Sequence, residues 1–185
     1  MTEIPAHARC VFRGKFHDVY QWEVVNFEGE AVIFEALRRP DVVSILATDG
    51  EVLWLAREEQ PGTRPFWTLF GGGVEPWEEP LEAARRELLE EAGMEAEGWE
   101  LLLEYVHPGR VKYKTWFYAA RGVRQVAAQR LDGGERIEVT PMAWERWLEL
   151  VEGATIRGHE LLRLWLCGQV HQERASELRA RLFGG

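Results

Sequence analysis

The sequence has few of the residues that several classes of protein require. Only two of its 185 residues are cysteine, Cys10 and Cys167, and they show no metal-binding spacing. We therefore expect two buried free thiols in a reducing compartment rather than a disulfide scaffold. No apolar run reaches the roughly 18 residues that a membrane-spanning helix needs, and residues 1–10 show no secretory signal. A cytoplasmic protein without membrane contact is expected.

Lysine is also scarce. Three of the 22 basic residues are lysine, and 31 acidic residues leave a net charge of −9. Nucleic-acid binding needs a surplus of basic side chains to neutralise phosphates, so this balance argues against it. It is compatible with an enzyme that recruits a polyanionic substrate through a divalent cation. The five histidines form no HxxxH pair and no serine lies in a Gly-x-Ser-x-Gly turn, which disfavours histidine metal sites and serine hydrolases.

The hydrophobic pattern predicts strands first, one helix between strands, and helices at the end. This order is typical of an α/β or α+β core built on a mixed sheet. A two-residue Asp49-Gly50 turn is expected to join two of the strands. The expected strands are residues 9–13, 17–27, 31–38, 42–48, 52–57, 66–70, 99–106, 115–121 and 136–139. The expected helices are residues 80–92, 143–151 and 158–182.

The most informative segment spans residues 72–94 and reads GGVEPWEEPLEAARRELLEEAGM. On the predicted helix Glu87, Glu90 and Glu91 stand at positions i, i+3 and i+4, so three carboxylates share one face. Like charges this close destabilise a helix unless something neutralises them. A hard divalent cation such as Mg²⁺, which prefers carboxylate oxygen, would remove the repulsion.

Acidic runs of this kind are also common on solvated helix faces, so the surroundings of the run matter. A glycine-rich turn precedes the helix and lets the backbone approach a ligand closely. Glu78 lies just before the helix, Arg86 lies beside the acids, and Gly93 ends the helix. Arg86 can also pair with Glu82, one turn earlier. Together these features predict a metal site.

The same segment resembles the Nudix box, a signature of Gly, five residues, Glu, seven residues, and then Arg-Glu-apolar-any-Glu-Glu-any-Gly-apolar. The resemblance implies the Nudix fold, a mixed β-sheet sandwiched between helices, and a loop–helix–loop that holds one to three Mg²⁺ or Mn²⁺ ions. It implies that Glu87, Glu90 and Glu91 are catalytic metal ligands, one of them able to act as base. It further implies that Arg86 orients them and that the carbonyl of Gly71 completes a coordination shell. The matching residues are Gly72, Glu78, Arg86, Glu87, Leu88, Glu90, Glu91, Gly93 and Met94.

Beyond the box the chain is similar to the ADP-ribose pyrophosphatases of this family. Pro108 begins a Pro-Gly fourteen residues after Met94, and Glu135 falls where that subfamily has a further metal-binding or catalytic acid. The resemblance implies that residues 1–40 are an N-terminal antiparallel strand extension that helps to build a homodimer. Residues 41–185 are then the Nudix hydrolase domain. The expected substrate-binding residues are Trp22, Arg57, Gly72, Gly73 and Pro108.

Three features depart from the subfamily pattern. Gly133 stands in place of a second acid, and residues 68–71 read Thr-Leu-Phe-Gly where Glu-Leu-Pro-Ala is usual. After the Pro-Gly, basic residues replace an acid. One interpretation is that they contact a second phosphate or a different sugar. The other is that they form a solvated strand end. The departures leave the substrate and the role of Glu135 as base open. The basic residues are Arg110, Lys112 and Lys114.

Six of the nine tryptophans divide into two groups. Trp22, Trp67 and Trp77 lie in predicted strands and loops near the box, where an aromatic ring can stack on a nucleobase. The others considered lie at apolar helical positions and are expected in the core. The expected core tryptophans are Trp144, Trp147 and Trp165.

We therefore expect a Mg²⁺-dependent hydrolase that cleaves the diphosphate linkage of a nucleoside diphosphate derivative, ADP-ribose or a related nucleotide sugar, into two monophosphates. A GDP-mannose-type hydrolase, a house-cleaning nucleoside triphosphatase and a non-catalytic nucleotide-sensing module are the alternatives. The intact box argues against the sensing module, and the missing acids after the box argue for it. The expected partners are a small nucleotide substrate and a second copy of the chain.

Overall fold

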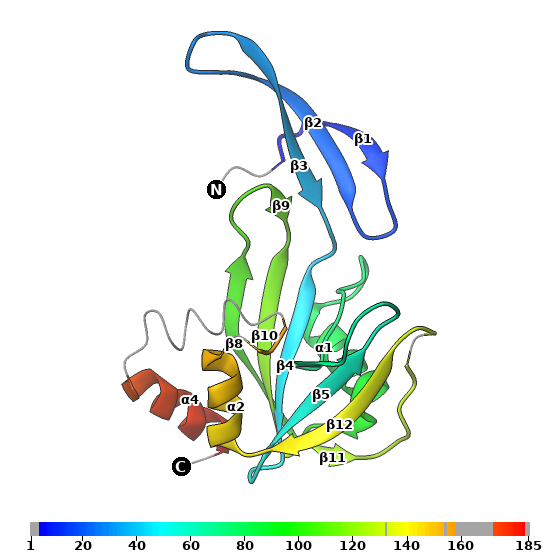
Figure 1. The fold of residues 1–185 in the computed structure, drawn as a ribbon, viewed down its shortest axis with the longest axis vertical. Coiled ribbons are helices and arrows are strands. Elements are labelled where there is room, and N and C mark those ends of the chain that lie inside the picture. Colours follow the sequence, from blue (N-terminus) through cyan, green and yellow to red (C-terminus); the bar gives the residue numbers. More distant parts are fainter. Residues whose placement is uncertain (1–3, 132, 154, 158–171, 184–185) are drawn as a thin grey trace.

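The computed structural model describes residues 4–131, 133–153, 155–157 and 172–183. It shows a mixed sheet between helices, with a smaller sheet extending from one end (Figure 1). The strands are β1 Arg9–Arg13, β2 Asp18–Val25, β3 Ala31–Arg38, β4 Val42–Thr48, β5 Leu53–Glu59, β6 Phe66–Thr68, β7 Met94–Glu95, β8 Gly98–Val106, β9 Val111–Lys112, β10 Lys114–Arg121, β11 Arg124–Gln125 and β12 Arg136–Met142. The helices are α1 Pro80–Ala92, α2 Trp144–Glu152 and α4 Gln172–Phe183.

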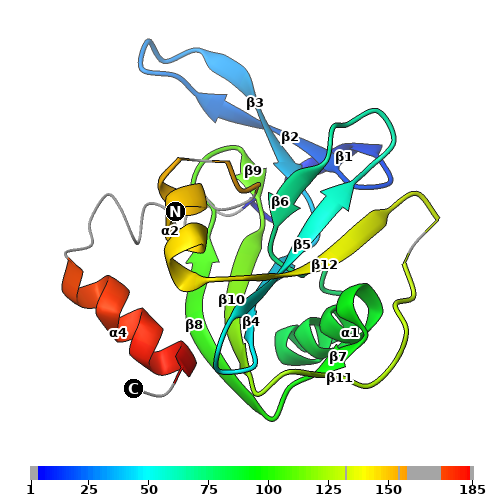
Figure 2. The ribbon, with the colours of Figure 1, turned by 60° about the horizontal axis from the view of Figure 1, so that its bottom comes forward.

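The central sheet has the strand order β12-β5-β4-β10-β8, with β6 paired to β5. Strands β4 and β10 are parallel, and the other pairs are antiparallel. Helix α1 covers one face of this sheet, and α2 and α4 cover the other (Figure 2). The predicted α/β class, with a mixed sheet sandwiched between helices, is confirmed.

Successive residues of the central strands supply two separate hydrophobic cores, because side chains alternate between the faces of a sheet. In β4, Ile45 packs with Leu88 of α1 on one face. The next residue, Leu46, packs with Trp147 of α2 on the other face. Each such side chain stabilises the fold by roughly 1.5–3 kcal/mol when fully buried. Trp144 also lies in the second core, as predicted.

Helix α1 begins and ends where the sequence predicts. Pro80 occupies its first turn, where the missing N–H costs no helical hydrogen bond. Gly93 follows its last residue with a left-handed φ of 66°, and its N–H donates to the carbonyls of Leu88 and Leu89. The buried stripe that holds the helix on the sheet consists of Ala83, Ala84, Leu88 and Ala92.

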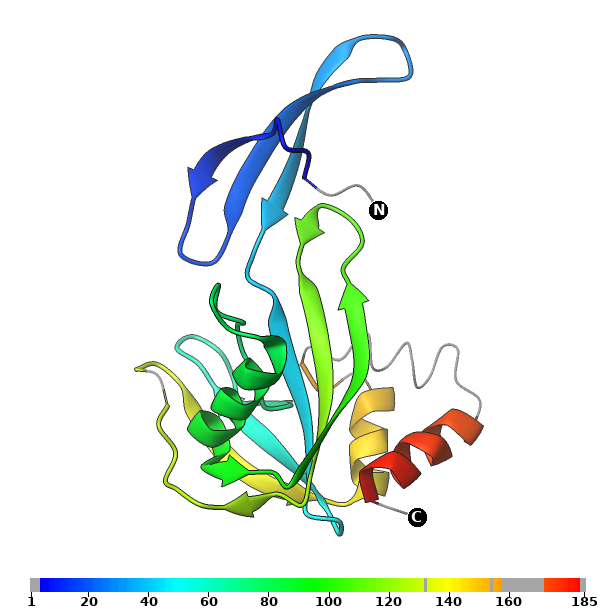
Figure 3. The same ribbon diagram turned by 180° about the vertical axis from the view of Figure 1, so that it is seen from behind.

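A second sheet, of order β1-β2-β3-β9, extends from one end of the central sheet (Figures 1 and 3). Three of its strands are the predicted N-terminal strands. The fourth strand, β9, lies after the box in the sequence. It pairs in parallel with β3 through Leu37 and Val111. The predicted use of residues 1–40 as a dimerisation lobe stays a prediction.

The predicted two-residue hairpin turn between β4 and β5 is wrong. Thr48 pairs with Leu53, so four residues form the connection. Asp49 explains the longer loop, because its Oδ1 accepts the N–H groups of Glu51 at 2.9 Å and Val52 at 3.1 Å. An aspartate that binds backbone groups two residues ahead stabilises a turn of its own.

Other predictions fail or fall outside the described residues. Strand β12 runs on through Pro141, because it is an edge strand, where proline removes no necessary ladder bond. Cys10 is half-buried on β1 rather than buried, and its Sγ contacts the carbonyl of Phe12.

Residues 158–171, which include Trp165 and Cys167, lie outside the described residues. Within the described part of the chain, no helix is long and apolar enough to cross a membrane.

Candidate active site

The glycine loop runs beside β4 and meets the box helix. The N–H groups of Val43 and Ile45 donate to the carbonyls of Gly72 and Phe70, which fixes the loop on the sheet. The N–H of Gly71 then donates to Glu91 Oε2 at 2.9 Å. These contacts place the loop directly against the carboxylate face of α1.

Glu87 packs against the same loop, next to Gly72. A Cβ added to Gly72 would lie 2.3 Å from Glu87 Oε1. Any side chain at Gly72 would therefore displace the carboxylate. Glu87 and Glu91, one helical turn apart, both face the glycine loop, as the helical spacing predicts.

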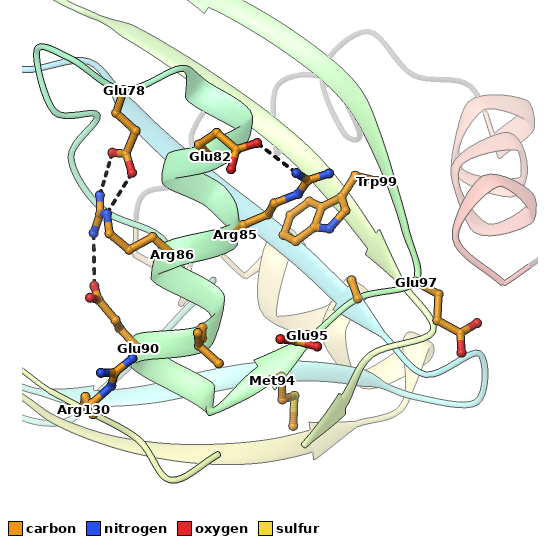
Figure 4. A pocket seen from close by; sticks show the side chains of 12 residues that line it. Glu78, Glu82, Arg85, Arg86, Glu90, Met94, Glu95, Glu97, Trp99 and Arg130 are labelled. Atoms are coloured by element: carbon orange, nitrogen blue, oxygen red, sulfur yellow. Dashed lines mark hydrogen bonds and ion pairs between the residues drawn. The ribbon is translucent and has the colours of Figure 1, made fainter. Parts of the chain in front are cut away.

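Arg86 connects the acids of the helix to the loop before it (Figure 4). Its Nε and Nη2 each donate to Glu78 at 3.0 Å, which is the bidentate geometry that suits a guanidinium. Its Nη1 donates to Glu87 at 2.8 Å and to Glu90 at 3.1 Å. Nη2 also donates to the carbonyl of Gly73. Arg86 therefore links Glu78, Glu87 and Glu90, and its role in orienting metal ligands stays a prediction.

Two details of the helix differ from the sequence analysis. Glu82 does not pair with Arg86 but with Arg85, at 2.8 Å, because Arg86 is already engaged by Glu78 (Figure 4). Glu90 does not face the glycine loop with the other two acids. It is 39% exposed, and it lines a cavity of about 560 Å³ on the outer side of the helix.

The electrostatics single out Glu91. Burial raises its pKa well above the ordinary value, and the charges of Glu87, Glu58 and Glu135 raise it further. Among the described residues, only the N–H of Gly71 lowers it. Glu91 is thus a buried acid without a cation beside it, a condition that is costly for the charged form.

The neighbouring acids behave differently because Arg86 reaches them. Burial raises the pKa of Glu87, and the hydrogen bond and charge of Arg86 oppose that rise. The hydrogen bonds from Arg86 lower the pKa of Glu78. Glu78 in turn is the largest cause of the raised pKa of Arg86, which stays protonated.

Two acids from neighbouring strands add to this cluster. Glu135 lies just before β12, and its charge acts on both Glu87 and Glu91. Glu58 of β5 pairs with Ile137 of β12 and acts on Glu91. The sequence analysis missed Glu58. Strand alternation could have found it, because Glu58 shares a face with Ala56, which is buried beneath α1.

The donor set fits a hard divalent cation. Carboxylate oxygens dominate the donor set. Burial raises the pKa of Glu91, and a cation beside it would stabilise its charged form. In the described residues no three acidic, histidine or cysteine side chains already converge as ligands of one ion. Arg86 holds Glu87 and Glu90 instead, so ligation by both requires their carboxylates to turn from the guanidinium.

The residues predicted to bind substrate are spread over the molecule. Gly72 and Gly73 lie in the loop against the acids. Arg57 points to the opposite face of β5 from Glu58, where its guanidinium lies over the ring of Trp67. Trp22 packs on Phe34 in the N-terminal sheet. The substrate roles of Arg57 and Trp22 stay predictions.

The remaining predicted contacts lie around the N-terminal sheet and the loop before α1. Pro108 is exposed between β8 and β9. Trp77 is 82% exposed in the loop before α1 and is free to contact a ligand. Arg110 lies over the ring of Phe34, and Lys114 pairs with Glu104. The role of the basic residues after the Pro-Gly stays open between the two interpretations.

A cleft of about 690 Å³ lies between the N-terminal sheet and the glycine loop. Gly73 and Glu78 line its box end. Lys15 and Phe16 line its outer end, together with Arg38. The volume is in the range of small-molecule sites, and the walls combine cations with an aromatic ring that is 65% exposed. The sequence analysis missed this cleft because its walls come from distant segments.

Comparison with protein families decides the identity. The family model described as the NUDIX domain matches residues 37–165.

The chain belongs to the Nudix family. The predicted family and enzyme class are therefore confirmed. Nudix hydrolases generally use divalent metal ions and act on small nucleotide substrates.

Individual relatives agree with this. An ADP-ribose pyrophosphatase of Bacillus subtilis is 29% identical over 150 residues, which is 79% of this chain and 81% of the relative. An RNA pyrophosphohydrolase of Brucella anthropi is 30% identical over 137 residues, covering 62% of this chain and 79% of the relative. A crystal structure of an ADP compounds hydrolase matches with a TM-score of 0.69 at 23% identity, over 89% of this chain and 94% of that one. It supports the Nudix fold.

Proposed function

We propose that this Nudix enzyme hydrolyses the diphosphate linkage of ADP-ribose or a related nucleotide sugar, with Mg²⁺ or Mn²⁺, to give two monophosphates. The observation that carries the proposal is the pair of carboxylates, Glu87 and Glu91, held against the glycine loop. Glu91 is buried there without a neutralising partner. A divalent cation held here would supply positive charge beside Glu91 and would bind oxygens of the substrate's diphosphate.

The roles follow from these positions. Glu87, Glu90 and Glu91 hold the metal ions, with help from Glu135 and the carbonyl of Gly71. Mg²⁺ bound here supplies a water of lowered pKa and neutralises charge on the diphosphate. A carboxylate of this cluster would accept the proton from the attacking water.

Arg86 and the glycine loop keep the cluster in place. Arg86 holds Glu78, Glu87 and Glu90 through its fixed fork of donors. None of the hydrogen bonds among the described residues uses the carbonyl of Gly71, whereas those of Phe70 and Gly72 bond to β4. The Gly71 carbonyl is thus available as a ligand.

The nucleoside end of the substrate fits the cleft between the N-terminal sheet and the loop. Phe16 offers a face on which a base stacks, and Lys15 and Arg38 offer charges to phosphate oxygens. The relative named ADP-ribose pyrophosphatase supports ADP-ribose as the first substrate to test.

We also propose a homodimer in which the N-terminal sheet contacts a second copy. Large apolar side chains on this sheet are exposed, and exposed apolar patches mark interaction surfaces. A second copy has the same apolar surface to bury against it, and a twofold contact is the commonest arrangement. Outside the cleft, the exposed residues are Val11, Phe12, Val25, Phe27, Val32 and Ile33.

A substrate panel tests the proposal. ADP-ribose, GDP-mannose, nucleoside triphosphates and 5′-triphosphorylated RNA are incubated with the enzyme and Mg²⁺, and the products are separated. Preferred conversion of ADP-ribose or another nucleotide sugar to two monophosphates is expected. Preference for a triphosphate or for RNA would overturn the substrate assignment, and binding without turnover of any compound would favour the sensing module.

A further inference from the structure

The segment Val126–Arg130 closes the C-terminal end of the box helix. Helix ends leave carbonyl groups without helical partners. The N–H of Arg130 donates to the carbonyl of Glu90 at 2.8 Å, and the N–H groups of Val126 and Ala127 donate to the carbonyl of Gly93. A Cβ on Gly93 would lie 2.2 Å from the carbonyl oxygen of Ala127, so the contact is close.

Gln129 completes this closure with its side chain. Its amide nitrogen Nε2 donates to the carbonyl of Glu91 and to the carbonyl of Ile137, the latter at 3.1 Å. Both acceptors are carbonyls, so both amide protons are used and the orientation of the amide group is fixed. Gln129 itself is exposed, so it contributes no core packing.

The two carbonyls belong to two elements of the active site. Glu91 is the acid buried against the glycine loop. Ile137 belongs to β12, and Glu135 lies two residues before it, just outside the start of that strand. Neither bond reaches a carboxylate directly. Ile137 of the strand and Leu88 of the helix also belong to one hydrophobic cluster.

We infer that Gln129 is a positioning residue that sets the distance between Glu91 on α1 and Glu135 before β12. It acts through the backbone of both and touches no substrate. This inference rests on the proposed function, since it assigns Gln129 to the same metal-binding acids. Loss of a residue that holds metal ligands in place typically lowers metal affinity or activity by about 10–100-fold.

The test compares three variants of the full chain. Gln129→Met keeps the length and removes both donors, and Gln129→Lys returns N–H donors at a similar reach. Gln125→Met is the matched control, because Gln125 is exposed at the end of β11, just before this segment, and its amide donates to the carbonyl of Ala127 at 3.4 Å. Mn²⁺ affinity is measured by titration without substrate, and kcat, KM and the thermal midpoint in chelator are measured beside it.

Gln129→Met is expected to weaken Mn²⁺ binding and lower kcat by about tenfold, with KM for the substrate changed less than about twofold. Gln129→Lys should recover most of both, and Gln125→Met should match the wild type. A lowered thermal midpoint with unchanged Mn²⁺ affinity and kcat would mean a structural role and overturn the inference. If the wild type itself neither binds Mn²⁺ nor turns over substrate, the proposed function is wrong, and the inference that rests on it is wrong with it.

Discussion

Replacing Arg86 with alanine removes the side chain that ties the acids of the box together. Arg86 makes five hydrogen bonds, to Glu78 twice and to Glu87, Glu90 and the carbonyl of Gly73. Breaking a buried ion pair costs roughly 3–5 kcal/mol, because one charge is left unpaired. The side chain of Arg86 is 32% exposed, so solvent screening lowers the expected loss to about 2–3 kcal/mol.

Arg85→Ala is the matched control on the next residue. Arg85 has one ion pair, with Glu82, and both side chains are about half exposed, so its loss should cost roughly 0.2–1 kcal/mol. In thermal unfolding with chelator, Arg86→Ala should lower the midpoint by about 5–10 °C, and Arg85→Ala by no more than about 3 °C. Equal shifts for the two variants would refute the central role of Arg86 in ordering the acids.

Further predictions concern the acids and the assembly. Glu91→Gln should lower kcat by roughly 10²–10⁴, while Glu82→Gln should change it less than about threefold; equal losses would place the site elsewhere. Because the folded pKa of Glu91 is raised, metal-free wild type should lose stability relative to Glu91→Gln as pH rises above 4.5. Matched urea unfolding series measure this, and parallel curves for the two proteins would count against it. Light scattering should report the mass of two chains, and a monomer at micromolar concentration would exclude the dimer.

The sequence predicted the box well because its physics is local. The helix from Pro80 to Gly93 depends on a first-turn proline, an apolar stripe and a left-handed glycine, all visible in one segment. The placement of Glu87 and Glu91 on the loop side follows from helical spacing alone. The strands 9–13, 31–38 and 42–48 were likewise predicted at their observed bounds.

The sequence does not show which of several nearby acids an arginine binds. The pairing of Arg86 with Glu82 was reasonable from spacing, but Glu78 lies closer to it once the loop folds back. Arg86 also binds Glu90, whose side chain is partly exposed. Helical spacing places residues on a face without deciding which of several acids a guanidinium binds.

The sequence also does not predict contacts between distant segments. The cleft at Phe16 and the bonds of Gln129 join segments that are far apart in the chain, and no local pattern marks them. The hairpin prediction fails for a local reason. The Asp49-Gly50 dipeptide is typical of a two-residue turn, but here the Asp49 carboxylate stabilises a longer loop. Glu58 was within reach of the sequence, because strand alternation places it on the same face as the buried Ala56.

Turnover of ADP-ribose with and without metal tests the central claim most directly. Purified enzyme is incubated with ADP-ribose and Mg²⁺, then with excess chelator, and AMP and ribose 5-phosphate are quantified. Both products should form in equal amounts with Mg²⁺ and stop forming in chelator, because the carboxylates around Glu91 cannot neutralise a diphosphate unaided. Full turnover in excess chelator would contradict a metal-dependent site at the box.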